Sequence, residues 1–351
     1  MSKFQSLTIK EIKKETENAV SILFDIPTEL EPAFNFIAGQ YITLRILIEE
    51  KEIRRSYSIC SAPESNELRV VVKEVENGLF SNYATKKLKK GDRLEVAPPE
   101  GKFVLQTATS HQRNYAAFAA GSGITPIMSM IKSVLLKEIH STFVLVYGNR
   151  TIDETIFKLE IDDLKKRFPE RFFVKYVFSK KIHKDSILGR IDRSIVNLIV
   201  KQTFKNIVFD GFYLCGPGKM IDLVTNSLKE NGVAGSNIHF ELFTSTYTSG
   251  DTTSNNLEGS TEITIILDDE ETSFKMPQKK LILTAALDEG LDAPFSCQGG
   301  ICSSCLAKII EGSAIMDKNT ILSDAEVNDG FILTCQAHPT SHKITIDYDD
   351  V

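Results

Sequence analysis

Apolar and polar residues alternate along residues 1 to about 106, the pattern of strands that bury one face. The alternation is clearest at residues 41–48 and 68–75, and turn-forming residues separate such runs. We therefore expect a small antiparallel β-barrel in this part of the chain. One helix should begin near Phe80 and end before Gly91, because good helix formers lie between them and Gly91 opens a Gly-Asp stop signal.

The pattern changes after residue 114. Short apolar runs at 115–120 and 142–147 flank residues 125–138, whose apolar positions recur with helical periodicity. Strand and helix signals then alternate as far as Leu242. This order is typical of βαβ units, so we expect a parallel sheet with helices on both faces.

Residues 244–260 are almost free of apolar side chains and rich in Ser, Thr, Gly and Asn, as in a flexible linker. Two hairpin strands at 262–267 and 272–276, an amphipathic helix at 280–288 and a cysteine-rich loop should follow. The predicted organisation is multidomain: a barrel at 1–108, an α/β domain at 109–243, the linker at 244–260 and a small third domain at 261–351.

Composition narrows the class of protein. The chain has 351 residues, of which 42% are hydrophobic and 25% charged, so it is an ordinary globular sequence long enough for two or three domains. No run approaches the roughly 18–20 apolar residues that span a bilayer, and the first 15 residues are polar, so we expect a cytoplasmic protein without membrane insertion. A net charge of −6 argues against a nucleic-acid partner.

The charge is unevenly distributed along the chain. Residues 261–351 hold six Lys and Arg against 16 Asp and Glu, a net charge of −10. The first 260 residues hold 35 against 31, a net charge of +4. Such asymmetry suggests electrostatic docking, either within the molecule or with a partner protein.

Four of the six cysteines lie close to the C-terminus, at Cys297, Cys302, Cys305 and Cys335. Their spacing, C-x4-C-x2-C with a distant fourth cysteine, is typical of plant-type [2Fe–2S] ferredoxins. Gly299 and Gly300 permit the backbone dihedrals that turn N–H groups toward the sulfurs. A structural zinc ion is the alternative, although zinc sites usually have two C-x2-C pairs and this chain has one. With four thiolates available, we place His338 and His342 on the surface.

Two strings suggest a flavin site. Arg55, Tyr57 and Ser58 lie on a predicted strand and could meet a phosphate, an isoalloxazine face and the flavin N5 edge, although an exposed polar edge strand would look similar. Gly78 and Ser81 open the predicted helix, whose N-terminal amides could bind a pyrophosphate. Together they favour FAD over FMN, which lacks the second phosphate.

Two glycine-containing loops suggest a nucleotide site at the carboxyl edge of the predicted sheet. They are Gly121-Ser122-Gly123-Ile124-Thr125-Pro126 and Cys215-Gly216-Pro217. The first could also be an ordinary strand–helix turn, and Cys215 could be only a buried apolar residue. Ser179 and Lys180 end another strand and could hold the 2′-phosphate of NADP, which favours NADPH over NADH, although an ordinary basic loop is the alternative.

In combination, these strings and Glu241-Leu242-Phe243, which ends the predicted α/β domain, resemble the ferredoxin–NADP reductase superfamily. The ferredoxin-like cysteines behind them narrow the resemblance to oxygenase reductases. Further strings resemble the reductase subunits of phenylacetyl-CoA epoxidase complexes: Tyr147-Gly148-Asn149-Arg150-Thr151, Gly189-Arg190-Ile191-Asp192, Cys335-Gln336 and Ile346-Asp347-Tyr348-Asp349.

The resemblance implies an FAD-binding barrel, an NAD(P)-binding α/β domain and an α+β ferredoxin domain of the β-grasp type. By the resemblance, FAD is bound by Arg55, Tyr57, Ser58, Gly78 and Ser81 and covered by Phe243. The two glycine loops, with Gly121, Gly123, Thr125, Pro126, Cys215, Gly216 and Pro217, would bind the nicotinamide nucleotide. Ser58 and Thr125 would orient groups near N5, and Cys215 and Glu241 would line the nicotinamide side.

The implied electron route runs from NADPH to FAD, then to the [2Fe–2S] cluster and an external oxygenase. In the phenylacetyl-CoA case the acceptor would be a di-iron component on another chain, because this sequence has no Glu-x-x-His helix pairs. Two alternatives stay open: a reductase for an aromatic-ring dioxygenase or a fatty-acyl desaturase, and a non-enzymatic redox sensor.

Overall fold

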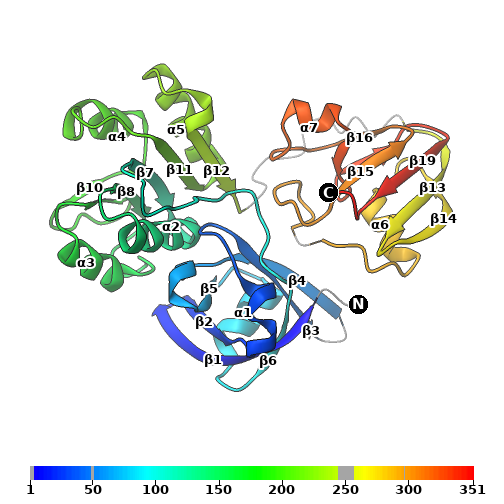
Figure 1. Cartoon of the computed structure of the whole chain (residues 1–351), viewed down its shortest axis with the longest axis horizontal. Coiled ribbons are helices and arrows are strands. Elements are labelled where there is room, and N and C mark those ends of the chain that lie inside the picture. The colour runs from blue at the N-terminus through cyan, green and yellow to red at the C-terminus, as the bar shows by residue number, and fades with distance from the viewer. Residues whose placement is uncertain (1–3, 49–50, 244–256, 296) are drawn as a thin grey trace. The chain divides into compact units, whose positions relative to one another are not determined.

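The computed structural model describes residues 4–48, 51–243, 257–295 and 297–351, and it divides into two units, Met1–Phe243 and Thr244–Val351 (Figure 1). Most of the linker predicted at 244–260 lies outside the described residues. None of the described helices combines the length and the apolar character needed to cross a membrane.

The first part of the N-terminal unit is a six-stranded antiparallel sheet in the order β4-β3-β6-β1-β2-β5. The outer strands β4 and β5 meet through a bridge between Ile59 and Val70, which brings the two edges of the sheet together. Side chains of alternate strand positions, among them Leu7, Ile22 and Val70, fill the interior. The elements are β1 (Gln5–Thr16), β2 (Ala19–Asp25), η1 (Thr28–Phe34), β3 (Tyr41–Ile48), β4 (Lys51–Ser58), η2 (Pro63–Ser65), β5 (Leu68–Lys73), α1 (Leu79–Lys86) and β6 (Arg93–Val96).

The second part is a parallel sheet in the order β10-β9-β8-β7-β11-β12, with helices on both faces as predicted. On β7, Tyr115 and Ala117 point into the core that α2 and α3 cover, whereas Ala116 and Phe118 point into the core on the other face, with α5. Its elements are β7 (Asn114–Ala120), η3 (Gly121–Gly123), α2 (Ile124–Lys137), β8 (Thr142–Asn149), α3 (Lys158–Arg167), β9 (Phe172–Phe178), β10 (Ser186–Leu188), α4 (Arg193–Asn197), η4 (Leu198–Thr203), β11 (Gly211–Gly216), α5 (Gly218–Glu230), η5 (Gly235–Asn237) and β12 (Ile238–Leu242).

The C-terminal unit packs α6 against a five-stranded mixed sheet in the order β14-β13-β19-β15-β17. Its central pair, β13 and β19, is parallel, and β16 and β18 form a separate short ladder. A capping box between Ser323 and Glu326 starts α7. The elements are β13 (Ser260–Leu267), β14 (Glu270–Pro277), α6 (Ile282–Asp288), β15 (Leu306–Glu311), β16 (Ala314–Met316), α7 (Asp324–Asn328), β17 (Phe331–Leu333), β18 (Ala337–Pro339) and β19 (Lys343–Asp347).

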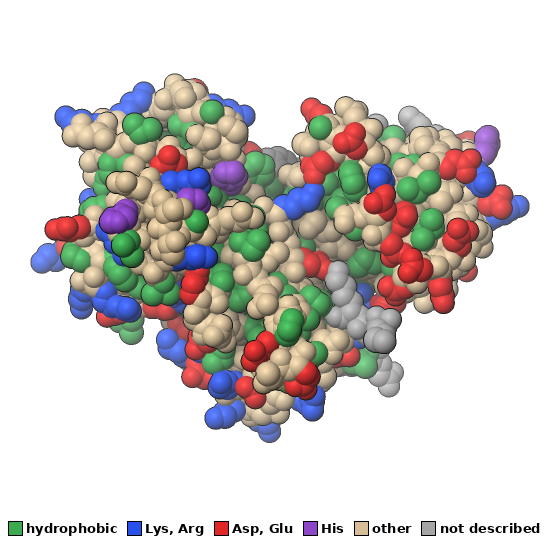
Figure 2. Space-filling model, viewed as in Figure 1, with side chains coloured by type: hydrophobic (Ala, Val, Ile, Leu, Met, Phe, Trp, Pro, Cys, Tyr) green, Lys and Arg blue, Asp and Glu red, His purple; other side chains and the backbone are tan. Residues whose placement is uncertain are grey.

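Acidic side chains gather over the C-terminal unit, as Figure 2 shows. Part of this acidic surface is organised by backbone hydrogen bonds, because the amides of Asp268 and Asp269 both donate to the carboxylate of Asp349. The β13–β14 turn and the C-terminal segment therefore present their carboxylates together. The predicted charge asymmetry is thus also a surface feature of this unit.

Candidate functional site

The strand order of the parallel sheet reverses at β7, because β8 lies on one side of it and β11 on the other. Ligands of open α/β sheets bind at the carboxyl edge at such a point. The loops that leave β7 and β11 touch there: a Cβ on Gly123 would lie 2.2 Å from the Cys215 carbonyl oxygen. Only glycine permits this approach, so the two glycine-containing loops form one surface.

Two side-chain hydroxyl groups fix the backbone of the first loop, residues 121–126. The Thr125 hydroxyl donates to the Ser122 carbonyl at 3.0 Å, and the Tyr147 hydroxyl donates to the Gly121 carbonyl at 2.9 Å. Gly121 adopts a φ of 56°, in the left-handed region. Among the described residues no side chain caps the N-terminus of α2, although the Ile124 N–H already donates to the Gly121 and Ser122 carbonyls of the preceding turn. Thr125 therefore supports the loop, and its predicted role near the flavin N5 edge stays a prediction.

Four of the predicted residues come together beside these loops. The Ser58 hydroxyl of the barrel donates to the Glu241 carboxylate at 3.0 Å, across 183 positions of sequence. Cys215 and Glu241 are register partners on the parallel strands β11 and β12. Phe243, half-buried, packs against the same core as Cys215. The barrel and the nucleotide-binding sheet thus share one polar contact at the predicted nicotinamide position.

Burial governs the protonation of this cluster. Burial of the Glu241 carboxyl group raises its pKa to about 8, and the hydrogen bond from Ser58 acts in the opposite direction. Burial first, and the neighbouring Glu241 charge second, raises the pKa of the Cys215 thiol well above its usual range. Near neutral pH both groups are therefore uncharged, and Cys215 is a protonated thiol and not a nucleophile.

The predicted flavin residues lie on β4 and at the start of α1. The Tyr57 ring, half-buried, lies 5.5 Å from the Phe80 ring between centroids, and Arg55 is exposed beside it. The Ser81 hydroxyl accepts from the Val75 amide at 3.1 Å and donates to the Gly78 carbonyl at 3.4 Å, so it closes the loop before the helix. Its part in binding a pyrophosphate would therefore be through its N–H group. A Cβ on Gly78 would lie 2.4 Å from the Ser81 hydroxyl, which accounts for the glycine.

A group of basic residues lies on the other side of β7 from β11, at the carboxyl ends of β8 and β9. The amides of Ser179 and Lys180 donate to the carbonyls of Asn149 and Arg150, at 3.0 and 2.9 Å. Arg150 thus lies alongside Lys180, which the sequence alone did not suggest. The signal in the sequence that could have pointed to Arg150 is its position: it is a basic residue that follows a strand next to β9 and so lies at the same edge of the parallel sheet as Lys180.

Lys73 is a second residue that sequence reasoning missed. It ends β5 of the barrel, and its Nζ atom lies 3.9 Å from where a Cβ on Gly121 would be. The ammonium group of this barrel residue therefore lies close to the Gly121 loop, which follows β7 of the parallel sheet. Nothing in the residues around Lys73 in sequence signals this contact, because it depends on how the two sheets pack.

The four predicted cluster ligands meet in the C-terminal unit. The sulfurs of Cys297 and Cys302 lie 3.1 Å apart, and Cys335 shares hydrogen bonds with both Cys297 and Cys305. Hydrogen bonds, first from Cys302 and then from Cys335, hold the pKa of Cys297 well below its usual range. The contacts run in a chain from Cys302 through Cys297 and Cys335 to Cys305, and within the described residues no group of three His, Cys, Asp or Glu side chains is placed to hold a single metal ion.

The loop around the thiols supplies backbone donors. The Gly299 amide donates to the Cys297 sulfur at 3.3 Å, and the Ile301 and Gly300 amides point to Cys297 and Cys335. Gly300 has a φ of 69°, and a Cβ there would lie 2.8 Å from the Lys318 carbonyl. This donor-lined thiol cradle fits a [2Fe–2S] cluster, whose sulfurs such N–H groups stabilise.

The placement of His338 on the surface was wrong. His338 is 3% exposed, because its strand β18 pairs with β16 and turns the ring inward. Its ring nitrogens face the Gln278 carbonyl at 3.2 Å and the Asp317 carboxylate at 3.0 Å, so burial does not leave them unpaired. His342 is exposed, as predicted.

Comparison with known families assigns each part of the chain. Residues 6–105 match the oxidoreductase FAD-binding domain, residues 118–226 match the oxidoreductase NAD-binding domain, and residues 265–340 match the 2Fe-2S iron-sulfur cluster binding domain. The order and position of the matches confirm the predicted fold class, the FAD and the iron–sulfur cluster. The last match favours [2Fe–2S] over the zinc alternative.

Relatives of the whole chain are components of oxygenase systems. One component of the 1,2-phenylacetyl-CoA epoxidase of Escherichia coli is 35% identical over 99% of both chains. The ferredoxin reductase component of the 3-ketosteroid-9-alpha-monooxygenase of Rhodococcus rhodochrous is 32% identical over 97% of this chain and 96% of its own. Phthalate dioxygenase reductase has the same fold, with a TM-score of 0.62, 24% identity and 98% of each chain covered.

The cluster ligands can be tested through metal content. We expect Cys335→Ala to lower the iron and acid-labile sulfide from about two of each per chain to near none, because the fourth thiolate completes the second iron. FAD should remain bound, since the matched FAD-binding domain, residues 6–105, lies in the other unit. Cys60→Ala, outside the cluster loop, is the control and should keep its iron. Zinc in place of iron in the unmodified protein would contradict the assignment.

Proposed function

The chain belongs to the oxygenase reductases that join FAD- and NAD-binding domains to a [2Fe–2S] domain, and from this we propose that it delivers electrons from NADPH to a phenylacetyl-CoA epoxidase. The observation that carries the proposal is the 35% identity with the epoxidase component along the whole chain. The 3-ketosteroid monooxygenase component is nearly as similar, so a reductase for another oxygenase is the second candidate. These relatives are oxidoreductase components, which leaves the redox-sensor alternative without support.

In the proposed assignment, FAD is held by Arg55, Tyr57, Ser58, Gly78 and Ser81 and covered by Phe243. When bound, FAD accepts two electrons from a nicotinamide and passes them on singly, which a [2Fe–2S] cluster requires. The work of the chain is to place the two cofactors and to exclude water between them. The Ser58–Glu241 contact joins the two domains at the point where that placement matters.

The nucleotide would lie along the carboxyl edge of the parallel sheet. The uncharged Cys215 thiol and Glu241 carboxyl groups would line the nicotinamide, and the N-terminus of α2 would bind phosphate with Lys73 nearby. Ser179 and Lys180, alongside Arg150, would bind the 2′-phosphate of NADPH. In this arrangement cationic side chains would lie beside the phosphates, and only uncharged side chains would lie beside the nicotinamide.

The acceptor would meet the acidic C-terminal unit. Carboxylates at Asp268, Asp269 and Asp349, brought together by backbone hydrogen bonds, offer a surface for a basic patch on a di-iron oxygenase component. Attraction of this kind increases the rate of encounter and weakens with salt. Electron delivery should therefore slow as ionic strength rises.

The experiment that tests the function pairs the purified chain with candidate acceptors. With NADPH present, we expect product formation with the oxygenase components of a phenylacetyl-CoA epoxidase, and not with those of a 3-ketosteroid monooxygenase. Product from the steroid substrate alone would favour the second candidate. Failure to reduce even an artificial acceptor would overturn the reductase proposal as a whole.

Glu241 gives the flavin-binding unit a pH-dependent stability. Its folded pKa of about 8 lies above the ordinary value of 4.5, so the folded state holds the proton more tightly. Its contribution to stability is therefore complete below pH 4.5 and is lost as pH rises through about 8. We expect the melting temperature of Glu241→Gln, measured by FAD release, to rise relative to wild type over this interval and to level above it. The exposed Glu170→Gln is the control, and a difference independent of pH would contradict the prediction.

Lys180 tests the nucleotide preference. Lys180→Ala should raise the KM for NADPH roughly tenfold, equivalent to about 1.4 kcal/mol, and leave the KM for NADH nearly unchanged, because only NADPH has the 2′-phosphate. Lys205→Ala is a matched control, since Lys205 precedes β11 and so lies at the opposite edge of the sheet. Equal changes for both nucleotides would place the 2′-phosphate elsewhere.

A further inference from the structure

Helix α2 carries a polar stripe on an otherwise apolar and buried helix. Ser129, Lys132 and Ser133 lie three and four positions apart, so they share one face. Ser129 and Ser133 are 0% and 1% exposed, and the Lys132 side chain is 16% exposed. Polar groups buried to this extent destabilise a helix unless they are hydrogen-bonded, so their partners show what the stripe is for.

The partners of the stripe belong to the barrel. The Ser129 hydroxyl donates to the Ser61 carbonyl at 2.6 Å, and the Ser133 hydroxyl donates to the Glu64 carboxylate at 2.9 Å. Lys132 donates to the Cys60 carbonyl at 3.2 Å. All three acceptors lie in residues 60–64, the segment that follows β4. The stripe therefore fastens the nucleotide-binding sheet to the chain leaving the predicted flavin strand.

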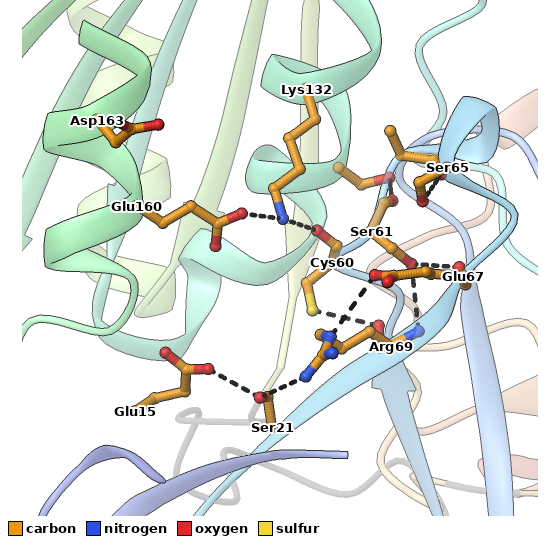
Figure 3. A network of polar contacts seen from close by, with 12 residues as sticks. Glu15, Ser21, Cys60, Ser61, Ser65, Glu67, Arg69, Lys132, Glu160 and Asp163 are labelled. Atoms are coloured by element: carbon orange, nitrogen blue, oxygen red, sulfur yellow. Dashed lines mark hydrogen bonds and ion pairs between the residues drawn. The ribbon is translucent and has the colours of Figure 1, made fainter. Parts of the chain in front are cut away.

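Lys132 differs from the two serines because it carries a charge and joins three elements (Figure 3). Its Nζ atom lies 2.7 Å from the Glu160 carboxylate of α3 and 5.5 Å from the centre of the Phe157 ring. The ammonium group thus links α2, α3 and the barrel. The Lys132 side chain is 16% exposed and the Glu160 side chain 38%, so this charge-assisted hydrogen bond is partly shielded from water and more directional than a fully exposed ion pair.

The peptide that Lys132 holds is also fixed from its other side. The Cys60 amide and the Cys60 thiol both donate to the Arg69 carbonyl of β5, at 2.8 and 3.2 Å. Arg69 in turn donates to Ser21 of the barrel, as Figure 3 shows. It also donates to Glu11. Cys60 is therefore clamped between β5 and α2, two residues after Ser58.

From this geometry we infer that Lys132 is a positioning residue for electron transfer from the nucleotide to the flavin, an inference that rests on the proposed function. It touches neither cofactor site. It sets the position of β4, which carries Arg55, Tyr57 and Ser58, relative to α2, whose N-terminus opens the nucleotide loop. A displacement of about 1 Å between reacting groups can lower a rate roughly a hundredfold, so a clamp at this point acts on the rate.

The test is Lys132→Met, which keeps the length of the side chain and removes its charge and its donors. We expect the rate of flavin reduction by NADPH, measured by stopped-flow absorbance, to fall roughly 10- to 100-fold. The dissociation constant of NADP⁺, from spectral titration, should change less than about threefold, because the nucleotide contacts are untouched. Lys132→Arg keeps the charge and reaches both acceptors, so it should restore most of the rate.

The matched control is Lys137→Met on the same helix. Lys137 faces the same barrel segment, but its ion pair with Glu64 spans 3.8 Å and its side chain is 39% exposed. The Lys137→Met variant should therefore reduce its flavin at the wild-type rate. A wild-type rate in Lys132→Met, an equal loss in Lys137→Met, or a nucleotide affinity that falls as much as the rate would each overturn the inference.

Glu160→Gln keeps the test decisive if Lys132→Met loses its FAD. It weakens the hold on the ammonium group and should lower the rate by a smaller factor, again without an equal loss of affinity. A wild-type rate in this variant would overturn the inference. If the unmodified protein fails to reduce its flavin with NADPH or NADH, the proposed function fails instead.

Discussion

The near-complete burial of helix α2 is the constraint on which the N-terminal unit depends. A helix with 11 of its 14 residues buried cannot leave polar groups to water, so each one needs a partner from a neighbouring element. Its N-terminus lies against the glycine loops, and its polar stripe faces the barrel. After its last turn, Glu138 accepts hydrogen bonds from Ser141 and Tyr115. The helix thereby determines where β4, the proposed flavin strand, lies relative to the proposed nucleotide loop.

The parts of this fold that sequence could predict are those with local causes. Strand β3 occupies residues 41–48, as expected, because apolar and polar residues that alternate with a period of two indicate a β-strand. The α2 helix, predicted at 125–138, runs from Ile124 to Lys137 for the same kind of reason. The cluster ligands follow from spacing alone, since three cysteines on one loop need little tertiary information. The Ser58–Glu241 pair joins residues 183 positions apart, and only a resemblance brought both to the same site.

The residues that sequence reasoning missed have causes that are not local. Lys73 and Lys132 act across the contact between barrel and parallel sheet, and neither has a neighbour in sequence that marks it. His338 was placed on the surface because polar residues usually lie there, but two acceptors from distant segments make its burial tolerable. A hydrogen-bond partner brought by the fold can reverse the expectation from residue type. Such partners are visible only once the packing is known.

The distribution of charge in the N-terminal unit suits a site where charge moves. Transfer of two electrons from a nicotinamide leaves a positive ring behind and adds negative charge to the flavin, so a fixed ion beside both would favour one side of the reaction. Burial keeps Cys215 and Glu241 uncharged near neutral pH, which avoids that bias. The cations, Lys73 and Lys180 among them, lie instead where the proposed assignment puts the phosphates, which carry constant charge. Binding energy from the phosphates can then hold the nucleotide without altering the balance at its reactive end.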